Sequence, residues 1–382
     1  MEDNQVIIRE NWFRKNPKKT LICLTLVFFC FTLLASEKIL KFINEKNGIF
    51  LDTDPRCIRI KEYRPLTKMV VSFPREHLKY TDNVFTKKYR VEIDDNGFIK
   101  PSKKYKDPDC SVVFLGGSTT ECMYVDEENR FPYVAGNILE KETGKKINSY
   151  NSGVSGNNTL HAIDILINKL IPIGPKIVVV MENINDLSTL IYEGTYWNTN
   201  SARSPLETQK KTKLLGKYLK EIFIPHLNKA YRDFKKMAFP KEDDEFAAAR
   251  GKKLSINKAA LVHEFAMNLQ TIIDICRDRG IIPVLMTQAN RVKKNPDEVI
   301  ALYIERYAHD TGINYVDFKE EFDVFNETIR KVGEKNNVLV IDLAKEVPQD
   351  KNYLYDIVHF NDNGSKYAAK IIAAKLKKII EQ

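Results

Sequence analysis

Four short blocks of this sequence carry the residue types that acyl-ester chemistry requires. A hydroxyl nucleophile needs a base, the base needs an orienting carboxylate, and the developing oxyanion needs hydrogen-bond donors. The chain offers a candidate for each role, in the order Gly116-Gly117-Ser118, Gly153-Val154-Ser155-Gly156, Asn183-Ile184-Asn185-Asp186 and Asp356-Ile357-Val358-His359. No block is specific alone, because serine and asparagine often cap helices and glycine is common in turns. Together the four blocks predict a serine hydrolase.

Ser118 is the predicted nucleophile. It follows an apolar run, residues 111–115 (SVVFL), through two glycines, so we expect a strand to end there in a tight turn that exposes the hydroxyl. The block is not Gly-x-Ser-x-Gly, which disfavours the nucleophile elbow of α/β-hydrolases. It also lacks the lysine of a P-loop, which disfavours nucleotide binding.

The base and the oxyanion donors come from the other three blocks. Only His359 among the histidines has a carboxylate, Asp356, three residues earlier in a short turn-rich segment. Asp356 is expected to fix the imidazole tautomer while His359 takes the proton of Ser118 and returns one to the leaving group. Gly156 and Asn185 follow the second and third predicted strands. The N–H groups of Ser118 and Gly156 and the Asn185 amide are therefore expected to form an oxyanion hole.

The order and placement of these blocks resemble the SGNH (GDSL-like) hydrolase superfamily over about residues 111–381. The resemblance implies an ester substrate, with carbohydrate esters an attractive class. It also implies the roles already assigned. By this resemblance, Ser118 is the nucleophile, Gly156 and Asn185 are further oxyanion donors, and Asp356 and His359 are the remaining catalytic residues.

Two departures from the family pattern affect what the resemblance implies. The third block usually reads Gly-x-Asn-Asp, whereas this chain has Asn183 in the glycine position, so the loop that carries Asn185 is expected to differ in shape. The first block reads GGST instead of GDS. Both departures weaken any inference about the substrate.

The elements that must position these residues alternate from residue 111 onward. Five short, mostly apolar runs are typical of central parallel strands, at residues 111–115, 146–150, 176–181, 281–287 and 338–342. Helical patterns cover residues 131–142, 159–170, 256–279, 296–309 and 364–380. We therefore predict an SGNH or flavodoxin-like three-layer α/β/α fold with a mostly parallel five-stranded sheet, whose functional residues lie at the carboxyl ends of the strands.

The N-terminal part predicts a signal-anchor transmembrane helix at residues 20–40. Residues 20–36 carry no charge and follow a basic tail, residues 1–19, and Glu37 and Lys38 can snorkel to extend the span. The basic flank predicts a single-pass protein with a cytoplasmic N-terminus and an extracytoplasmic catalytic domain. A cleaved signal peptide remains the alternative. Two glycosylation sequons, at Asn157 and Asn363, adjoin the site blocks, which favours a bacterial cell membrane over a eukaryotic secretory pathway.

Residues 41–110 are interpreted as a juxtamembrane stalk and a small β-rich lead-in without recognisable chemistry. The clearest hairpin signal there is Asp95-Asn96-Gly97. The hydrolase domain is predicted at residues 111–382, with a Lys-rich insertion at about 188–254. A connection this long is typical of a functional or disordered segment. A lid, a glycan-binding surface, a membrane-facing helical pair and a solvated helical excursion all stay open.

Composition limits the partners of the 382-residue chain. A net charge of +9 suits an anionic membrane, an acidic glycan or nucleic acid by sign alone. No zinc-finger spacing, RNP-like strand or basic recognition helix occurs, so no nucleic-acid partner is expected. No CxxC pair occurs either, and we predict neither a metal nor a cofactor. One or two disulfides stay open for the four cysteines outside the apolar span.

We therefore predict a membrane-anchored serine esterase or O-acyltransferase that forms an acyl-serine intermediate and acts on an O-acylated cell-envelope polysaccharide. Hydrolysis and transfer share this intermediate and differ in whether water or an acceptor hydroxyl attacks it. A lipase or lysophospholipase at the membrane surface is one alternative. A catalytically silent glycan-binding or assembly protein with the same fold is another. No pattern indicates a protein partner.

Overall fold

The computed structural model describes residues 11–49, 56–208, 211–238 and 257–381. The chain divides into two compact units. The first contains Met1–Pro55 and Gln209–Tyr218, and the second contains Arg56–Thr208 and Leu219–Gln382. All residues of the four sequence blocks belong to the second unit.

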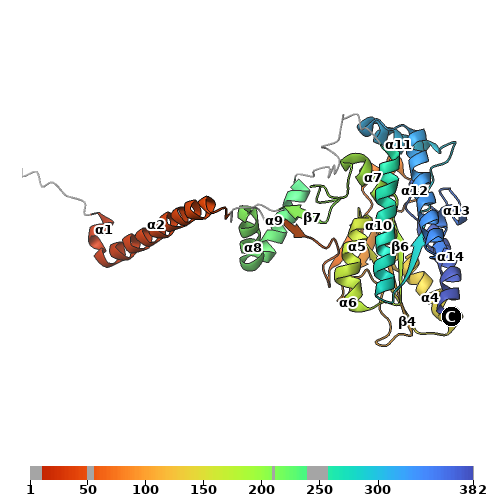
Figure 1. Ribbon diagram of the computed structural model, residues 1–382, viewed down its shortest axis with the longest axis horizontal. Coiled ribbons are helices and arrows are strands. Elements are labelled where there is room, and N and C mark those ends of the chain that lie inside the picture. The colour runs from red at the N-terminus through yellow and green to blue at the C-terminus, as the bar shows by residue number, and fades with distance from the viewer. Residues whose placement is uncertain (1–10, 50–55, 209–210, 239–256, 382) are drawn as a thin grey trace, which may run out of the picture. The chain divides into compact units, whose positions relative to one another are not determined.

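A five-stranded parallel sheet forms the centre of the second unit (Figure 1). The strands lie in the order β5-β4-β6-β8-β9, and every neighbouring pair is parallel. Their bounds are β4 Cys110–Gly116, β5 Ile147–Gly153, β6 Ile177–Met181, β8 Ile282–Met286 and β9 Val340–Ile341. The predicted fold class and the five strand positions are confirmed, although β9 is shorter than expected. After β4 the chain adds β5 on one side of that strand and then β6 on the other, so the strand order reverses at β4. Ligands of such sheets bind at the carboxyl ends of the strands beside this reversal.

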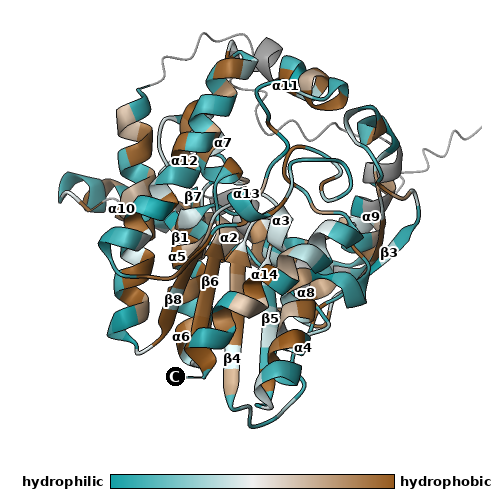
Figure 2. Cartoon of the chain, turned by 90° about the vertical axis from the view of Figure 1, so that its right-hand side faces the viewer, coloured by the Kyte–Doolittle hydropathy of each residue, from teal (hydrophilic) through white to brown (hydrophobic). Residues whose placement is uncertain are grey.

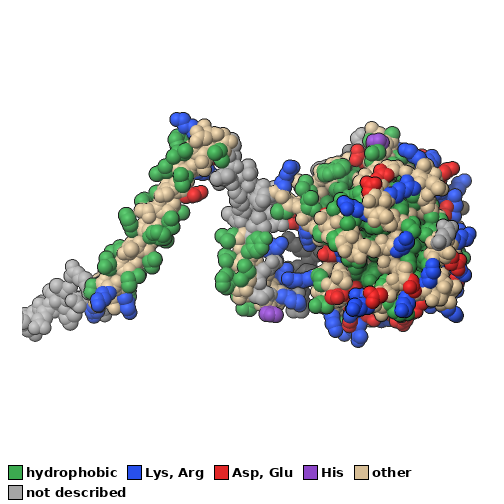
Figure 3. Space-filling view, turned by 60° about the horizontal axis from the view of Figure 1, so that its bottom comes forward, with side chains coloured by type: hydrophobic (Ala, Val, Ile, Leu, Met, Phe, Trp, Pro, Cys, Tyr) green, Lys and Arg blue, Asp and Glu red, His purple; other side chains and the backbone are tan. Residues whose placement is uncertain are grey.

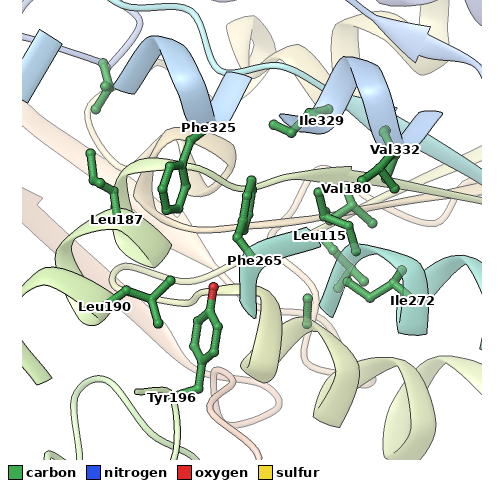
Figure 4. Close-up of a cluster of buried hydrophobic side chains, with 14 of the residues drawn as sticks. Leu115, Val180, Leu187, Leu190, Tyr196, Phe265, Ile272, Phe325, Ile329 and Val332 are labelled. Atoms are coloured by element: carbon green, nitrogen blue, oxygen red, sulfur yellow. The ribbon is translucent and has the colours of Figure 1, made fainter. Parts of the chain in front are cut away.

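Helices cover both faces of the sheet, as Figure 2 shows, and β4, β6, β8 and β9 are apolar for this reason, whereas the edge strand β5 carries mostly polar residues. Alternate residues of β6 enter different cores: Val178 and Val180 lie in one, and Val179 lies in the other. The first core is closed by α5 (Thr159–Ile165), α7 (Ile184–Glu193), α10 (Lys258–Asp278) and α12 (Tyr315–Lys335), and the second by α4 (Phe131–Thr143) and α14 (Asp362–Ile380). Figure 4 shows the first core, where Val180 and Leu115 lie among side chains from these helices.

Helices α7 and α12 were not predicted. Helix α12 presents Phe318, Phe322, Phe325 and Ile329 at helical spacing, and all four are buried. Its many charged residues lie between these positions, so the periodicity is visible only when the apolar residues are read alone. Helix α11 (Glu298–Thr311) agrees with the predicted helix at 296–309.

The lead-in is β-rich and is attached to the main sheet. Strands β2 (Lys68–Ser72) and β3 (Lys88–Glu92) form an antiparallel pair. Around the predicted hairpin turn, Ile93 and Ile99 form an antiparallel bridge, and Ile99 bridges in turn to Asn151 of β5. The hairpin signal is therefore confirmed. A separate short strand, β1 (Arg56–Ile58), pairs antiparallel with β7 (Leu206–Thr208).

The predicted Lys-rich insertion at about 188–254 starts inside α7. Residues 188–193 complete α7, and Tyr196, Arg203 and Ser204 are buried within the second unit. The described part of the excursion consists of α8 (Lys211–Phe223) and α9 (Pro225–Ala238). Residues 239–254 of the predicted insertion lie outside the described residues.

The first unit contains a short helix, α1 (Trp12–Lys15), and a long apolar one, α2 (Pro17–Lys46). Within the described part of the chain, α2 is the one helix long and apolar enough to cross a membrane, judged by length and composition alone. None of its residues is buried, and hydrophobic side chains line its surface (Figure 3). The predicted span at 20–40 lies inside this helix. An N-terminal signal sequence has the same properties, so both interpretations stay open.

Candidate active site

Ser118 lies just beyond the carboxyl end of the central strand β4. The chain turns through Gly116 and Gly117 and enters the single-turn helix α3 (Ser118–Glu121), of which Ser118 is the first residue. A Cβ atom at Gly116 would lie 2.7 Å from the Met181 carbonyl oxygen of the neighbouring strand. Only glycine permits this close approach. The turn leaves Ser118 half-buried at the sheet edge instead of in the core.

His359 and Asp356 meet Ser118 in space although His359 is 241 positions away in sequence. Nε2 of His359 lies 2.7 Å from Oγ of Ser118, and Nδ1 lies 2.7 Å from Oδ2 of Asp356. Both distances are those of hydrogen bonds. The structure therefore brings together the three side chains that the sequence blocks suggested, in the order hydroxyl, imidazole, carboxylate.

A compact turn fixes the Asp356 and His359 side chains. The Tyr355 N–H donates to the His359 carbonyl oxygen at 2.9 Å, which closes the turn. Oδ1 of Asp356 accepts the N–H groups of Val358 at 3.0 Å and His359 at 2.8 Å, so Oδ2 is left for the imidazole. The Tyr355 ring stacks on the imidazole with ring centroids 5.5 Å apart. These contacts pre-organise the carboxylate–imidazole pair.

The electrostatics of this pair favour a protonated imidazole. Burial by itself raises the pKa of Asp356, but the His359 imidazole and the two backbone N–H groups hold it below its ordinary value. Burial by itself lowers the pKa of His359, but the Asp356 carboxylate and then Glu121 raise it above its ordinary value. A protonated His359 imidazole is therefore stabilised by both Asp356 and Glu121.

The candidate oxyanion donors lie around the nucleophile turn. Gly156, with φ +75°, lies in the loop after β5, which packs on that turn through a 3.1 Å hydrogen bond from the Val154 N–H to the Gly116 carbonyl. The N–H groups of Ser118 and Gly156 donate to no residue that the structure describes. Two backbone donors are thus available at the site.

Asn185, in the first turn of α7, is the third candidate donor. A Cβ atom at Gly117 would lie 2.1 Å from Nδ2 of Asn185, so the second glycine of the first block makes room for this amide. Nδ2 donates to the Asn157 carbonyl at 2.6 Å. Oδ1 accepts from Nη1 of Arg203 at 3.1 Å. Because both ends of the amide are engaged, its NH₂ group is held toward the nucleophile turn.

Arg203 was missed by sequence reasoning. Its side chain is buried in the segment that follows α7, and its contact with Asn185 spans 18 positions of irregular chain. No motif or periodicity marks the residue. Asn183, the departure from the family pattern, has φ −166°, an extended conformation that needs no glycine. Its Nδ2 donates to the Phe322 carbonyl at 3.2 Å, so it ties the start of α7 to α12.

Glu121 is a second buried carboxylate beside the triad and was also missed. It accepts the Ser155 N–H at 3.2 Å, the Ser155 hydroxyl and the Tyr63 hydroxyl. Burial raises the pKa of Glu121, and the hydrogen bonds and His359 oppose that rise. Glu121 therefore links the nucleophile helix to the Gly156 loop. Its position three residues after Ser118 was a readable signal, because such residues share a helix face.

Lys61 brings a positive charge to the Gly156 loop. Nζ of Lys61 donates to the Ala202 carbonyl at 2.8 Å. A Cβ atom at Gly156 would lie 2.8 Å from the same Nζ atom. Nδ2 of Asn157 donates to the Lys61 carbonyl at 3.2 Å. The lead-in, to which sequence analysis gave no chemistry, thus supplies Lys61 and Tyr63 to one side of the site.

Other reactive groups have ordinary surroundings. Cys122 is buried close to Ser118, and burial raises the pKa of its thiol to about 12, so it is a neutral packed side chain at pH 7. Over the described ranges, the structure contains no cluster of three or more His, Cys, Asp or Glu side chains that could hold a metal ion.

Comparisons with known proteins show which family and which solved structures the chain resembles. Residues 114–367 match the sequence model of the GDSL-like lipase/acylhydrolase family. No curated protein matches the chain. Similar solved structures include an acetylxylan esterase from Geobacillus stearothermophilus, with 13% identity, 70% of this chain and 93% of that chain covered and a TM-score of 0.41. A lipase/acylhydrolase from Enterococcus faecalis has 16% identity and a TM-score of 0.39, and the match covers 71% of this chain and 96% of that chain.

Proposed function

Since the chain belongs to the GDSL-like lipase/acylhydrolase family, we propose that it is a serine esterase in which Ser118 is acylated. The observation that carries the proposal is the pair of 2.7 Å contacts that join Ser118 to His359 and His359 to Asp356. Two further observations support it. The Ser118 and Gly156 N–H groups have no partner among the described residues, and the Asn185 amide is fixed beside them.

In the acylation step, Oγ of Ser118 bonds to the acyl carbonyl carbon while Nε2 of His359 accepts the hydroxyl proton. The carbonyl oxygen becomes an oxyanion, which the donors of Ser118, Gly156 and Asn185 stabilise. The Asp356 carboxylate stabilises the imidazolium. The ester C–O bond then breaks, and the alcohol leaves with the proton of His359.

In the deacylation step, His359 removes a proton from the attacking hydroxyl as that oxygen bonds to the acyl carbon. The second tetrahedral intermediate collapses when the bond to Ser118 breaks, and the imidazolium returns a proton to Oγ. Water gives hydrolysis and a carbohydrate hydroxyl gives O-acyl transfer. The same residues serve both reactions, so only the acceptor decides between an esterase and an O-acyltransferase.

The variant Ser118→Ala tests the nucleophile. We expect its turnover of p-nitrophenyl acetate to fall by roughly a million-fold, to the level that binding and oxyanion donors alone sustain. A fluorophosphonate probe should add its mass to the wild-type protein and to Ser155→Ala, a neighbouring serine control, but not to Ser118→Ala. Unchanged turnover by a folded Ser118→Ala variant would refute the assignment.

For the substrate, we propose an O-acylated polysaccharide of a bacterial cell envelope. The support is the ester chemistry of the family together with α2, which is preceded by a basic segment. If α2 is retained as a single-pass anchor with that segment in the cytoplasm, the second unit lies outside the membrane, where such glycans are found. Incubation with an O-acetylated glycan, with and without a deacetylated acceptor, distinguishes hydrolysis from transfer by mass spectrometry of the products.

A lipase or lysophospholipase is the second candidate, favoured by the exposed apolar surface of α2 and of the excursion helices. A series of p-nitrophenyl esters separates the two. A short-chain optimum supports an acetylated glycan, and a long-chain optimum supports a lipid. A folded protein that no fluorophosphonate labels would instead be a silent binding or assembly protein.

A further inference from the structure

Residues 219–223 of α8 and residues 227–234 of α9 include large apolar side chains that are exposed. Six of these side chains have exposed fractions between 47% and 74%: Leu219, Ile222, Phe223, Leu227, Tyr231 and Phe234. We call this set the hairpin face. Apolar groups gathered in this way mark a surface that contacts something other than water.

The spacing of the hairpin face is that of a helix side that is normally buried. Residues 219, 222 and 223 share one face of α8, and residues 227, 231 and 234 share one face of α9. Helix α7 has the same spacing at Leu187, Leu190 and Ile191, and there all three side chains are buried in the core. The hairpin face is thus an amphipathic surface whose apolar side is left outside the core.

The same two helices are strongly basic. Residues 211–238 contain eight Lys and Arg residues and two acidic ones. Lys220, Lys229, Arg232 and Lys235 are exposed, and Figure 3 shows hydrophobic and basic side chains together over this part of the chain. An apolar stripe with aromatic residues, flanked by lysine and arginine, is typical of helices that lie in the interface of an anionic membrane.

The β1–β7 pairing ties the start of the excursion to the chain that comes from α2. Arg56 is paired with Thr208, so the chain enters β1 at the end of the ribbon where it leaves β7. Ten residue steps join Lys46 to Arg56, which span at most roughly 35 Å, and three join Thr208 to Lys211, at most roughly 10 Å. Chain length alone therefore limits the distance between the start of α8 and the carboxyl end of α2 to roughly 50 Å.

We propose that the hairpin face docks on the surface of an anionic lipid bilayer. Its apolar and aromatic side chains enter the boundary between headgroups and acyl chains, and its Lys and Arg side chains lie at the lipid phosphates. This inference goes beyond the proposed function. It depends on that proposal in one point, that α2 anchors the chain in a membrane. Two contacts with the bilayer hold the second unit more firmly than a single helix does.

Tryptophan probes in the full chain, reconstituted into phosphatidylcholine/phosphatidylglycerol vesicles, test the docking. Trp12 and Trp197 are first replaced by Phe, and one probe is then introduced as Phe223→Trp or Phe234→Trp. Val316→Trp, at an exposed position of α12, is the water-facing control, and Phe28→Trp in α2 reports the anchor. We expect blue-shifted emission and strong quenching at 223 and 234 by lipids brominated near the headgroup, and quenching of Phe28→Trp by lipids brominated deep in the acyl chains. Val316→Trp should remain unquenched.

The outcomes separate the proposals. Quenching of Phe28→Trp without quenching at 223 and 234 overturns the docking and leaves the anchor intact. Quenching at 223 and 234 without quenching at 28 supports the docking and overturns the anchor. A blue shift that depends on protein concentration but not on brominated lipid indicates a second copy of the chain and also overturns the docking. Fluorophosphonate labelling of the same samples reports Ser118 independently.

Charge reversal tests the anionic part of the proposal. The ratio of docked to undocked protein is measured from the quenching at low salt. In the double variant Lys220→Glu/Lys229→Glu this ratio should fall by at least about tenfold. The matched variant Lys366→Glu/Lys370→Glu changes two exposed lysines of α14 and should leave the ratio unchanged. Equal losses in both variants would show that net charge, and not the hairpin face, drives the binding.

Discussion

In the proposed mechanism, Asp356 and His359 form the base arm of the site, and Gly156 and Asn185 form the oxyanion arm. The two arms are held by different kinds of contact. The base arm lies within four consecutive residues, and its carboxylate is fixed by N–H groups of the same turn. The oxyanion arm joins two loops after different strands. Its residues depend on partners far away in sequence, such as Arg203 for Asn185.

The contrast extends to the lead-in. Lys61 and Tyr63 reach the Gly156 loop from the segment before β4, with Tyr63 bonded to Glu121 across 58 positions. The base-arm turn also has distant partners, because the Arg291 N–H donates to the Ile357 carbonyl at 2.9 Å and the Asp82 N–H donates to the Tyr355 carbonyl at 2.7 Å. These contacts reach backbone atoms of the turn, whereas the distant partner of Asn185 binds its side chain. We infer that the orientation of the Asp356 carboxylate depends mainly on its own turn, and that the oxyanion arm is more sensitive to positions outside the family motifs.

The largest effect is expected in the base arm, from Asp356→Asn. The amide can still accept the backbone N–H groups of the turn, so stability should change little, but it neither stabilises the imidazolium nor enforces its tautomer. We expect kcat to fall about 10,000-fold. Asp323→Asn, on the exposed face of α12, is the matched control. A loss of less than tenfold would assign the orienting role to another group, with Glu121 the nearest carboxylate to examine.

A smaller effect is expected for the first change in the oxyanion arm, Asn185→Ala. The loss of one donor to the transition state should lower kcat by about 100- to 1,000-fold with little change in KM. Asn314→Ala removes the N-cap of α12 and should lower stability by about 1 kcal/mol without changing kcat. If Asn185→Ala changes KM and not kcat, the amide binds the ground state and is not an oxyanion donor.

Substitution of Arg203, which positions Asn185, is expected to lower kcat by less than Asn185→Ala does. Arg203→Lys keeps the charge but loses the contact with Oδ1 of Asn185, and the freed amide should cost roughly tenfold to 100-fold in kcat. The sharper measurement is the double variant with Asn185→Ala. If Arg203 acts through Asn185, its substitution has no further effect in that background. Additive losses would mean that Arg203 acts independently.

The smallest effect is expected from Glu121→Gln, in the pH profile. The Glu121 carboxylate contributes to the raised pKa of His359, so its neutral replacement lowers that pKa. Because the base must be unprotonated, activity is lost as pH falls through this pKa, and the acid limb of kcat/KM should move to lower pH. Glu128→Gln, an exposed neighbour, should leave the limb in place. No movement in Glu121→Gln would show that Glu121 is neutral in the working enzyme.

The fold was largely predictable because its signals are local. A buried parallel strand such as β6 reads as an apolar run, and the glycine turn after β4 follows from two adjacent residues. Helix α12 was missed although its four apolar positions were regularly spaced. The burial of residues such as Tyr196, which lies within the predicted insertion, could not be read from the sequence, because it depends on packing that no local pattern reports.

By itself, the sequence determined the strand order along the chain, the serine turn and the base arm, because each depends on residues within a few positions of one another. Only the tertiary structure decided that Arg203 orients Asn185, that Glu121 joins the nucleophile helix to the Gly156 loop, and that Lys61 lies beside that loop. The physical reason is that a hydrogen bond between distant segments depends on how whole elements pack. Neither partner then carries a local mark of the other.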